Sequence, residues 1–187
     1  MKSKKMMCTL ALFLLLCTVV GGTPAFAYAL ENYYVANKAT QYAWGANMQS
    51  DSGIIKNGWL AAVSAWNAEG MNIGYNSISQ NLLESRRLDS DGPNGITEVD
   101  VYTNGTPTTV RKFICYMNAA KPNWNSTTAR STGTHEIGHV VGLAHSNAYY
   151  SIMRDGRDRE EIYTIQTDDR NGFRARYNGK AARANEE

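Results

Sequence analysis

Residues 135–145 read His-Glu-Ile-Gly-His-Val-Val-Gly-Leu-Ala-His, and the interpretation of the whole chain starts from them. His135 and His139 are four residues apart, so a helix of 3.6 residues per turn places both imidazoles on one face, where they can bind one metal ion. Glu136 lies about 100° round the same helix, beside such a metal rather than on it. This is the place for a base that takes a proton from an activated water.

Three residues beyond the second histidine, Gly142 supplies what a third ligand needs. Glycine can adopt a positive φ, end the helix and turn the chain, so that His145 returns to the same metal. Three nitrogen ligands with an open fourth position describe a catalytic zinc site, because structural zinc sites fill all four positions.

Two other interpretations of this stretch are weaker. Six specified residues match by chance in fewer than about one in a million sequences of this length, and the three histidines of the chain all lie in the motif. A thermolysin-like site would use only the first two histidines and recruit Glu160 or Glu161 as the third ligand. That alternative leaves Gly142 and His145 unexplained.

The composition is that of a folded domain. The chain has 187 residues, of which 43% are hydrophobic and 19% charged, which excludes a disordered chain. The formal net charge of +2 argues against a dedicated nucleic-acid binder.

The first 27 residues have the pattern of a secretory signal peptide. Lys2, Lys4 and Lys5 precede an apolar run over 6–20, and Ala25-Phe26-Ala27 forms an A-x-A cleavage site. The alternative is an uncleaved membrane anchor, but the run is shorter than the roughly 20 residues of a span. We therefore expect a mature protein that starts near Tyr28, is secreted to the extracellular space and is not stably inserted in a membrane.

Removing the signal peptide changes both the charge and the cysteine count. Without its three lysines, 16 basic residues remain against 17 acidic ones, a net charge of −1. Cys8 and Cys17 leave with it, so Cys115 remains alone and no intramolecular disulfide can form.

We expect residues 28–187 to form one monomeric domain with a frayed polar tail at about 180–187. A strand is predicted over 39–47, with Tyr42 and Trp44 on one face. Ile55, Trp59, Val63 and Trp66 recur at helical spacing and predict an amphipathic helix, with Asp51 and Ser52 as caps and Gly70 as its stop.

Further strands are predicted around Met71, Ile73 and Tyr75 and around Val99 and Val101. Asn104-Gly105 suggests a tight hairpin turn into a strand over 108–117, with Phe113, Cys115 and Met117 on one face. Segment 89–95 could hold calcium through its carboxylates, but it fails the EF-hand spacing, and its Asp, Gly, Pro and Asn residues favour a plain turn.

The zinc motif is followed by features that resemble the metzincin metalloendopeptidases. Met153, eight residues after His145, resembles their Met-turn. Ser146 directly after the third histidine and the short step to the methionine are similar to the matrixin branch. Thr167-Asp168-Asp169, with Thr167 as N-cap, is similar to the start of the matrixin C-terminal helix. The likeness covers most of residues 39–178.

This resemblance implies an α+β catalytic domain with a twisted mixed β-sheet, an N-terminal helix, an active-site helix and a C-terminal helix. It implies one catalytic Zn²⁺ on His135, His139 and His145, with Glu136 as general base and a protein or peptide substrate. A substrate could lie extended along an edge strand near 113–117. The alternative is a catalytically silent zinc-binding interaction module or toxin-like factor with the same fold.

The sequence also departs from the family pattern. Arg154-Asp155-Gly156 follows Met153 where matrixins usually have Tyr-Pro, and Cys115 lacks the Pro-Arg-Cys-Gly setting of a cysteine switch. We expect no prodomain, because the N-terminal subdomain of the family needs most of the chain between Tyr28 and His135.

Overall fold

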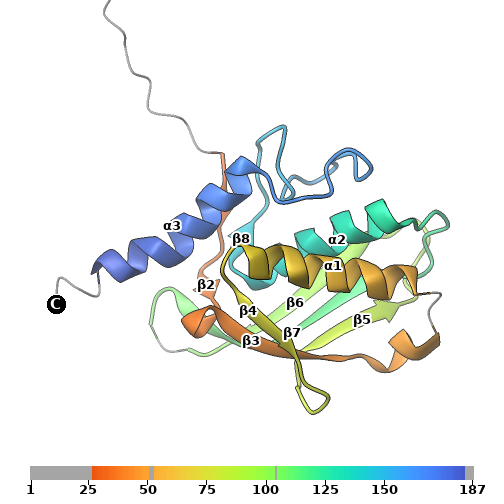
Figure 1. The fold of residues 1–187 in the computed structure, drawn as a ribbon, viewed down its shortest axis with the longest axis horizontal. Helices are drawn as coiled ribbons and strands as arrows, with labels where there is room; N and C mark the ends of the chain where they lie inside the picture. The colour runs from red at the N-terminus through yellow and green to blue at the C-terminus, as the bar shows by residue number, and fades with distance from the viewer. Residues whose placement is uncertain (1–26, 51–52, 104, 184–187) are drawn as a thin grey trace, which may run out of the picture.

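The structure is a computed structural model that describes residues 27–50, 53–103 and 105–183 (Figure 1). Helices α1 (Ile54–Ala68) and α2 (Ser126–Val140) lie together over one face of a β-sheet, and α3 (Thr167–Arg183) extends from one end of the molecule. This confirms the mixed sheet with three helices. The predicted signal peptide lies outside the described residues, apart from Ala27.

The main sheet has six strands. Five follow the order β2-β7-β5-β3-β4, and β6 pairs with β7 on the side opposite β5. All pairs are parallel except β6 with β7. The strands are β2 (Tyr33–Tyr34), β3 (Ala39–Trp44), β4 (Asn72–Tyr75), β5 (Leu82–Arg86), β6 (Gly95–Val101) and β7 (Thr108–Asn118). A separate antiparallel pair joins β1 (Ala29–Leu30) to β8 (Leu143–Ala144).

The predicted edge strand near 113–117 is wrong. Those residues lie in β7, which has β5 on one side and β6 on the other, so the edge of the sheet is β6. The N–H of Asn118 donates to the carbonyl of Asn94 at 2.8 Å. Because hydrogen-bonded pairs alternate along an antiparallel ladder, the backbone groups of Gly95, Thr97 and Val99 point away from β7.

The predicted amphipathic helix is confirmed as α1. Its apolar positions Ile55, Trp59, Val63 and Trp66 are all buried. The indole N–H of Trp66 donates to the carbonyl of Thr134 at 2.9 Å, which ties α1 to α2. Gly70 has a φ of 102° where the helix ends, as predicted. The proposed caps at 51 and 52 lie outside the described residues.

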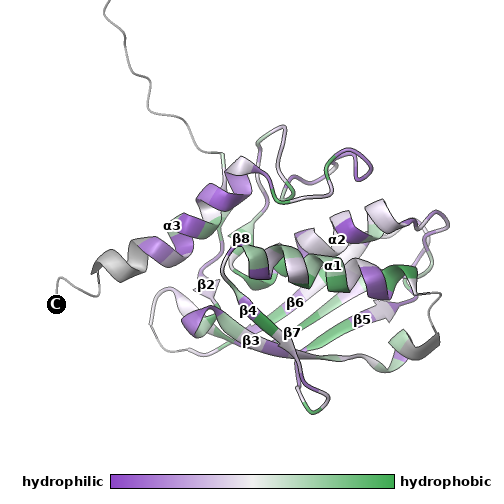
Figure 2. Ribbon diagram, in the orientation of Figure 1, coloured by the Kyte–Doolittle hydropathy of each residue, from purple (hydrophilic) through white to green (hydrophobic). Residues whose placement is uncertain are grey.

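A glycine in α1 lets the two helices approach closely. A Cβ on Gly58 would lie 2.7 Å from Ala129 of α2, a distance that no side chain tolerates. Figure 2 shows apolar residues on α1 and on the strands beneath it, whereas α3 is largely polar. The core therefore lies between the sheet and the α1–α2 pair, and it fixes the position of α2.

The remaining strand predictions hold in outline. β3 ends at Trp44, before a 3-10 helix, η2 (Ala46–Ser50), and its Tyr42 and Trp44 rings pack edge to face at 5.2 Å. The β6–β7 hairpin is confirmed, although its loop spans 102–107 and is longer than the predicted tight turn; residue 104 lies outside the described part. Phe113, Cys115 and Met117 are all buried, as predicted.

Segment 89–95 forms the predicted turn. The N–H of Gly92 donates to the carbonyl of Asp89 at 3.0 Å, and the side chain of Asn118 donates to the same carbonyl at 2.8 Å. No described helix is both long and apolar enough to cross a membrane.

Candidate metal centre

The helix that carries the first two histidines begins at a capping box that sequence reasoning missed. The side chain of Asn125 accepts from the backbone N–H groups of Thr127 and Thr128, each at 2.9 Å. The Thr128 hydroxyl in turn accepts from the backbone N–H of Asn125 at 3.0 Å. The Asn-x-x-Thr spacing was the available signal, although the usual box has Glu or Gln at its last position.

The helix ends as the sequence predicted. Gly142 has a φ of 91°, and its N–H donates to the carbonyl of His139 at 2.9 Å. A Cβ at this position would lie 2.4 Å from the carbonyl oxygen of Tyr33, so both conformation and space require glycine. The chain then pairs with β1 through β8 and brings His145 back over the helix.

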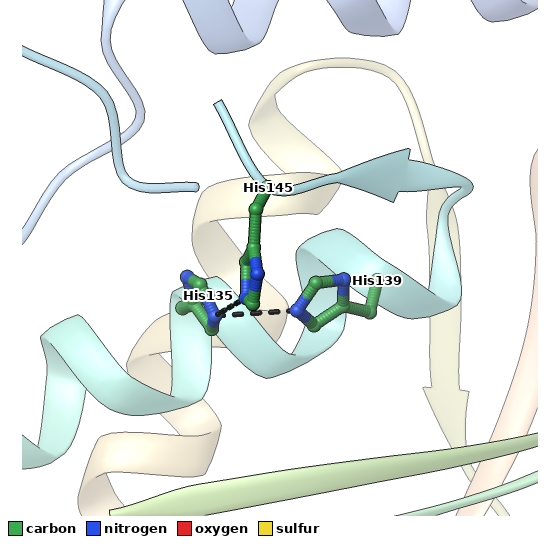
Figure 3. A group of neighbouring side chains, drawn as sticks. All are labelled: His135, His139 and His145. Carbon is green, nitrogen blue, oxygen red and sulfur yellow. Dashed lines mark hydrogen bonds between the residues drawn. The ribbon is translucent and has the colours of Figure 1, made fainter. Parts of the chain in front are cut away.

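The three histidines converge through their Nε2 atoms (Figure 3). The Nε2 atom of His135 lies 3.2 Å from that of His139 and 3.3 Å from that of His145. Tetrahedral zinc with Zn–N bonds of about 2.0–2.1 Å separates its nitrogen ligands by about 3.3–3.4 Å. The spacing therefore fits one zinc ion held by these three side chains.

Hydrogen bonds at the other ring nitrogen set the tautomer of two imidazoles. Nδ1 of His135 lies 2.7 Å from the carbonyl of Ile152, and Nδ1 of His139 lies 2.9 Å from that of Leu143. A carbonyl only accepts, so each Nδ1 carries the proton and each Nε2 presents a lone pair to the centre. Facing lone pairs at such distances repel one another unless a cation lies between them.

The electrostatic surroundings keep these imidazoles neutral. Burial lowers the pKa of His139 to about 4, and burial together with the Arg157 guanidinium lowers the pKa of His135 well below its usual value. Neutral imidazole is the form that binds metal.

Glu136 lies beside the histidines and is buried. The hydroxyl of Thr97 donates to Oε2 of Glu136 at 2.7 Å. A Cβ on Gly95 would lie 2.4 Å from Oε1, so this glycine of β6 leaves room for the carboxylate. Burial raises the pKa of Glu136 to about 7, against the opposing effects of the Thr97 hydrogen bond and of Arg157.

Met153 is buried beneath the helix of the histidines. A Cβ on Gly138 would lie 2.3 Å from its sulfur, so the thioether packs directly against the α2 backbone. The N–H of Arg154 donates to the carbonyl of Ser151 at 3.2 Å, which closes a turn around Met153. The N–H of Ser146 donates to the carbonyl of Met153 at 3.0 Å and joins this turn to the segment of His145.

Two adjacent carboxylates of α3 hold these segments. Asp169 accepts from the Ser151 hydroxyl at 2.5 Å and from the N–H groups of Ile152 and Met153 at 2.8 and 3.2 Å. Asp168 accepts from the Ser146 hydroxyl at 2.7 Å.

The family model for Matrixin matches residues 43–178. The chain belongs to the matrixin family. A chain of a solved structure, "GM1 bound form of the ECX AB5 holotoxin", matches with a TM-score of 0.51 at 14% identity, over 80% of this chain and 88% of that one. Such a low identity shows a shared fold alone. No curated protein gives a match. As a matrixin, the chain contains a zinc-metallopeptidase-like domain.

Neither rival ligand joins the histidines of this matrixin in the described part of the chain. Oε1 of Glu160 accepts from the side chain of Asn125 at 2.9 Å. Asn125 precedes His135 by ten residues, about 15 Å along a helix. Glu161 is exposed. Within the described ranges, the three histidines are the group of at least three potential ligands close enough to bind one metal ion.

A cavity of about 380 Å³ opens over the histidines and Glu136. The edge strand β6 borders it through Gly95 and Thr97, and the segment after Met153 borders it through Asp155, Gly156, Arg157 and Arg159. This second wall is where the sequence departs from the usual matrixin pattern.

The N-cap prediction for α3 is corrected by the structure. The carbonyl of Gln166, not that of Thr167, accepts the first helical hydrogen bond, from the N–H of Arg170.

Proposed function

We propose that the protein is a secreted zinc-dependent endopeptidase that hydrolyses peptide bonds. The observation that carries this proposal is the convergence of three Nε2 lone pairs, 3.2 and 3.3 Å apart, beside the buried carboxylate of Glu136. When bound, zinc supplies Lewis-acid chemistry: it polarises a carbonyl and makes a water molecule acidic near neutral pH.

The residues of the chain do the remaining work. Glu136 accepts the proton of the attacking water and returns it to the leaving amine, and its carboxylate is held in place by the Thr97 hydroxyl. His135 and His139 keep their orientation through hydrogen bonds to backbone carbonyls. Met153 supports the helix from beneath.

The edge strand β6 is the binding surface for an extended peptide. The outward backbone groups of Gly95, Thr97 and Val99 can add the substrate as a further strand, within reach of the metal centre. Strand addition reads the main chain and gives register with little sequence preference, so preference must come from the cavity wall.

The proposal includes secretion of the protein from the cell. Residues 1–27 direct secretion and are removed, which leaves Tyr28 as the first residue. N-terminal sequencing of the protein recovered outside expressing cells should give Tyr28. Recovery only from inside the cells, with residues 1–27 attached, would contradict secretion.

The test of the activity is metal dependence. Purified protein should contain one zinc per chain by elemental analysis and should cleave an unfolded protein substrate. A chelator should abolish cleavage, and added zinc should restore it. If the protein binds one zinc and cleaves nothing with or without the chelator, the catalytically silent zinc-binding module is the better interpretation.

A further inference from the structure

The wall of the cavity formed after Met153 carries two positive charges. Arg157 and Arg159 both border the cavity together with His135. The ion pairs found in the described part of the chain join Arg111 to Asp100 and Arg170 to Glu69. Neither arginine of the cavity wall is therefore within 4.0 Å of a carboxylate oxygen there.

The position of the Arg157 guanidinium is fixed by neutral groups. Its Nε and Nη2 donate to the hydroxyl and carbonyl of Ser131 at 3.3 and 3.0 Å, and its Nη1 donates to the carbonyl of Arg154 at 3.1 Å. Guanidinium has five N–H groups, so three bonds leave donors without an acceptor. Burial lowers the pKa of Arg157 to about 10, which keeps it charged at neutral pH.

Arg157 also lies directly against the metal centre. Its Nη1 is 3.1 Å from Nδ1 of His135. Because that Nδ1 already donates to Ile152 at the shorter distance of 2.7 Å, the two nitrogens meet as donors and form no hydrogen bond. A group bound by Arg157 would therefore lie next to a zinc ligand, close to the scissile bond.

Arg159 adds a second cation with an unmet donor. Its Nε is buried and has no hydrogen-bond partner among the residues that the structure describes. Its charge is near enough to Arg157 to lower the pKa of that residue. Two neighbouring guanidinium groups, both partly desolvated, favour an anion between or beside them.

The carboxylates around the cavity form no ion pair with these two arginines within the described ranges, although Glu136, Asp155 and Asp169 lie near enough to raise the pKa of Arg157. Asp155 is exposed, and its Oδ1 accepts from the N–H of Gly156 at 2.9 Å. The carboxylate of Glu136 accepts a hydrogen bond from the hydroxyl of Thr97 in β6. Glu31 also borders the cavity, and none of the three forms an ion pair with Arg157 or Arg159 in the described ranges.

We propose that Arg157 and Arg159 form a subsite for an acidic side chain, so that this peptidase prefers substrates with Asp or Glu close to the scissile bond. This inference rests on the proposed function and adds a substrate class to it. A carboxylate bound there would accept from the free N–H groups of both arginines, and a neutral amide of the same shape would leave one charge uncompensated.

The test compares matched substrates in one enzyme preparation. Cut sites in an unfolded protein mixture are mapped by mass spectrometry, and peptides are then made that differ only by Glu or Gln at the enriched position. Zinc-loaded wild type should cleave the Glu peptide at least about tenfold faster than the Gln peptide, as judged by kcat/KM. Because both rates come from the same preparation, partial unfolding cancels in the ratio.

Variants of the two arginines test whether these residues cause the preference for Glu over Gln. Arg159→Gln removes a side chain that makes no hydrogen bond to another described residue, so this variant should fold, and its ratio should fall at least about threefold. Arg157→Gln should reduce the ratio further. The matched control is Arg154→Gln, whose side chain stacks on Tyr149 outside the cavity and whose ratio should stay that of wild type.

Two results would overturn the inference in distinguishable ways. Efficient cleavage with no acidic preference, or a ratio unchanged in both arginine variants, would remove the subsite and leave the peptidase standing. No cleavage by zinc-loaded wild type on any substrate would remove the peptidase and the subsite together.

Discussion

At the scale of single residues, the carboxylate of Glu136, the proposed base, is positioned by a hydroxyl from a different element. Thr97 of β6 donates to Glu136 at 2.7 Å, and the Cys115 thiol lies 3.6 Å behind the same hydroxyl. Burial raises the pKa of Cys115 well above its usual value, so it is a protonated thiol and not a nucleophile. Thr97 is therefore a positioning residue of the proposed reaction.

Replacing the Thr97 hydroxyl should reduce turnover more than binding. A hydrogen bond to a charged group contributes about 1.5–3 kcal/mol, so Thr97→Val should lower kcat about tenfold or more with little change in KM. Thr97→Ser keeps the hydroxyl and should retain most of the activity. Steady-state kinetics of both variants checks this, and equal activity of the Val and Ser variants would contradict it.

Local spacing was enough to predict that the three histidines come together, but the rest of the candidate site could not be predicted from the sequence. His135 and His139 are about one helical turn apart, and a glycine at position 142 indicates a backbone with positive φ, which the structure has. Thr97, by contrast, is 39 residues before Glu136, and their contact depends on how β6 lies against α2. Arg157 likewise reaches His135 only because the turn around Met153 folds back.

At the scale of elements, α3 and the turn around Met153 are held together by one buried carboxylate. Asp169 accepts four hydrogen bonds, three from residues 151–153 and one from the N–H of Gln166 at 2.8 Å. The turn in turn supplies the Ile152 carbonyl that orients His135. Loss of the Asp169 carboxylate should therefore loosen the orientation of His135, a candidate metal ligand, through the Ile152 carbonyl.

Asp169→Asn should destabilise the fold by about 3 kcal/mol, because the amide replaces one acceptor oxygen by a donor that faces N–H groups. Thermal unfolding measures the change. The control is Asp155→Asn, which alters an exposed carboxylate and should leave the melting temperature nearly unchanged. Equal melting temperatures of Asp169→Asn and wild type would refute this role.

The cap of α2 gives a second prediction at this scale. Asn125→Ala removes the acceptor of two N–H groups and should cost about 1 kcal/mol of stability. Asn123→Ala, two residues earlier on an exposed position, is the matched control and should cost little. Urea unfolding of the two variants separates them; a similar loss in both would argue against the cap.

Periodicity predicted the helices and strands well. It could not predict which strands pair, because strand pairing depends on residues that are far apart in the sequence. The positions of Ile55, Trp59, Val63 and Trp66 are enough to specify α1, since one helix face must be buried. An alternating pattern identifies β7 as a strand but not its neighbours, and β5 and β6 occupy both its edges. This is why the edge strand was misplaced from 95–101 to 113–117.

At the scale of the whole molecule, a bound metal would join two parts of the chain. His135 and His139 come from α2, and His145 comes from the segment beyond β8, which is itself paired with β1 near the N-terminal end of the described chain. Metal binding would therefore stabilise the assembly of these parts as well as the site.

Zinc should raise the melting temperature of the apoprotein. At a free zinc concentration of about 100 times Kd, linkage adds about 2.7 kcal/mol to the free energy of unfolding. His145→Asn removes an exposed side chain, so this variant should fold, yet its melting temperature should respond much less to zinc. An identical response in the variant and wild type would mean that zinc binds elsewhere.

The measurement that bears most directly on the proposed activity is cleavage by Glu136→Gln with zinc bound. Elemental analysis should find one zinc per chain in both the variant and wild type, because Glu136 lies beside the histidines and is not a ligand. Wild type should cleave an unfolded protein substrate, and the variant should be at least about a hundredfold slower for want of a base. A zinc-loaded variant that cleaves as fast as wild type would contradict the proposed mechanism.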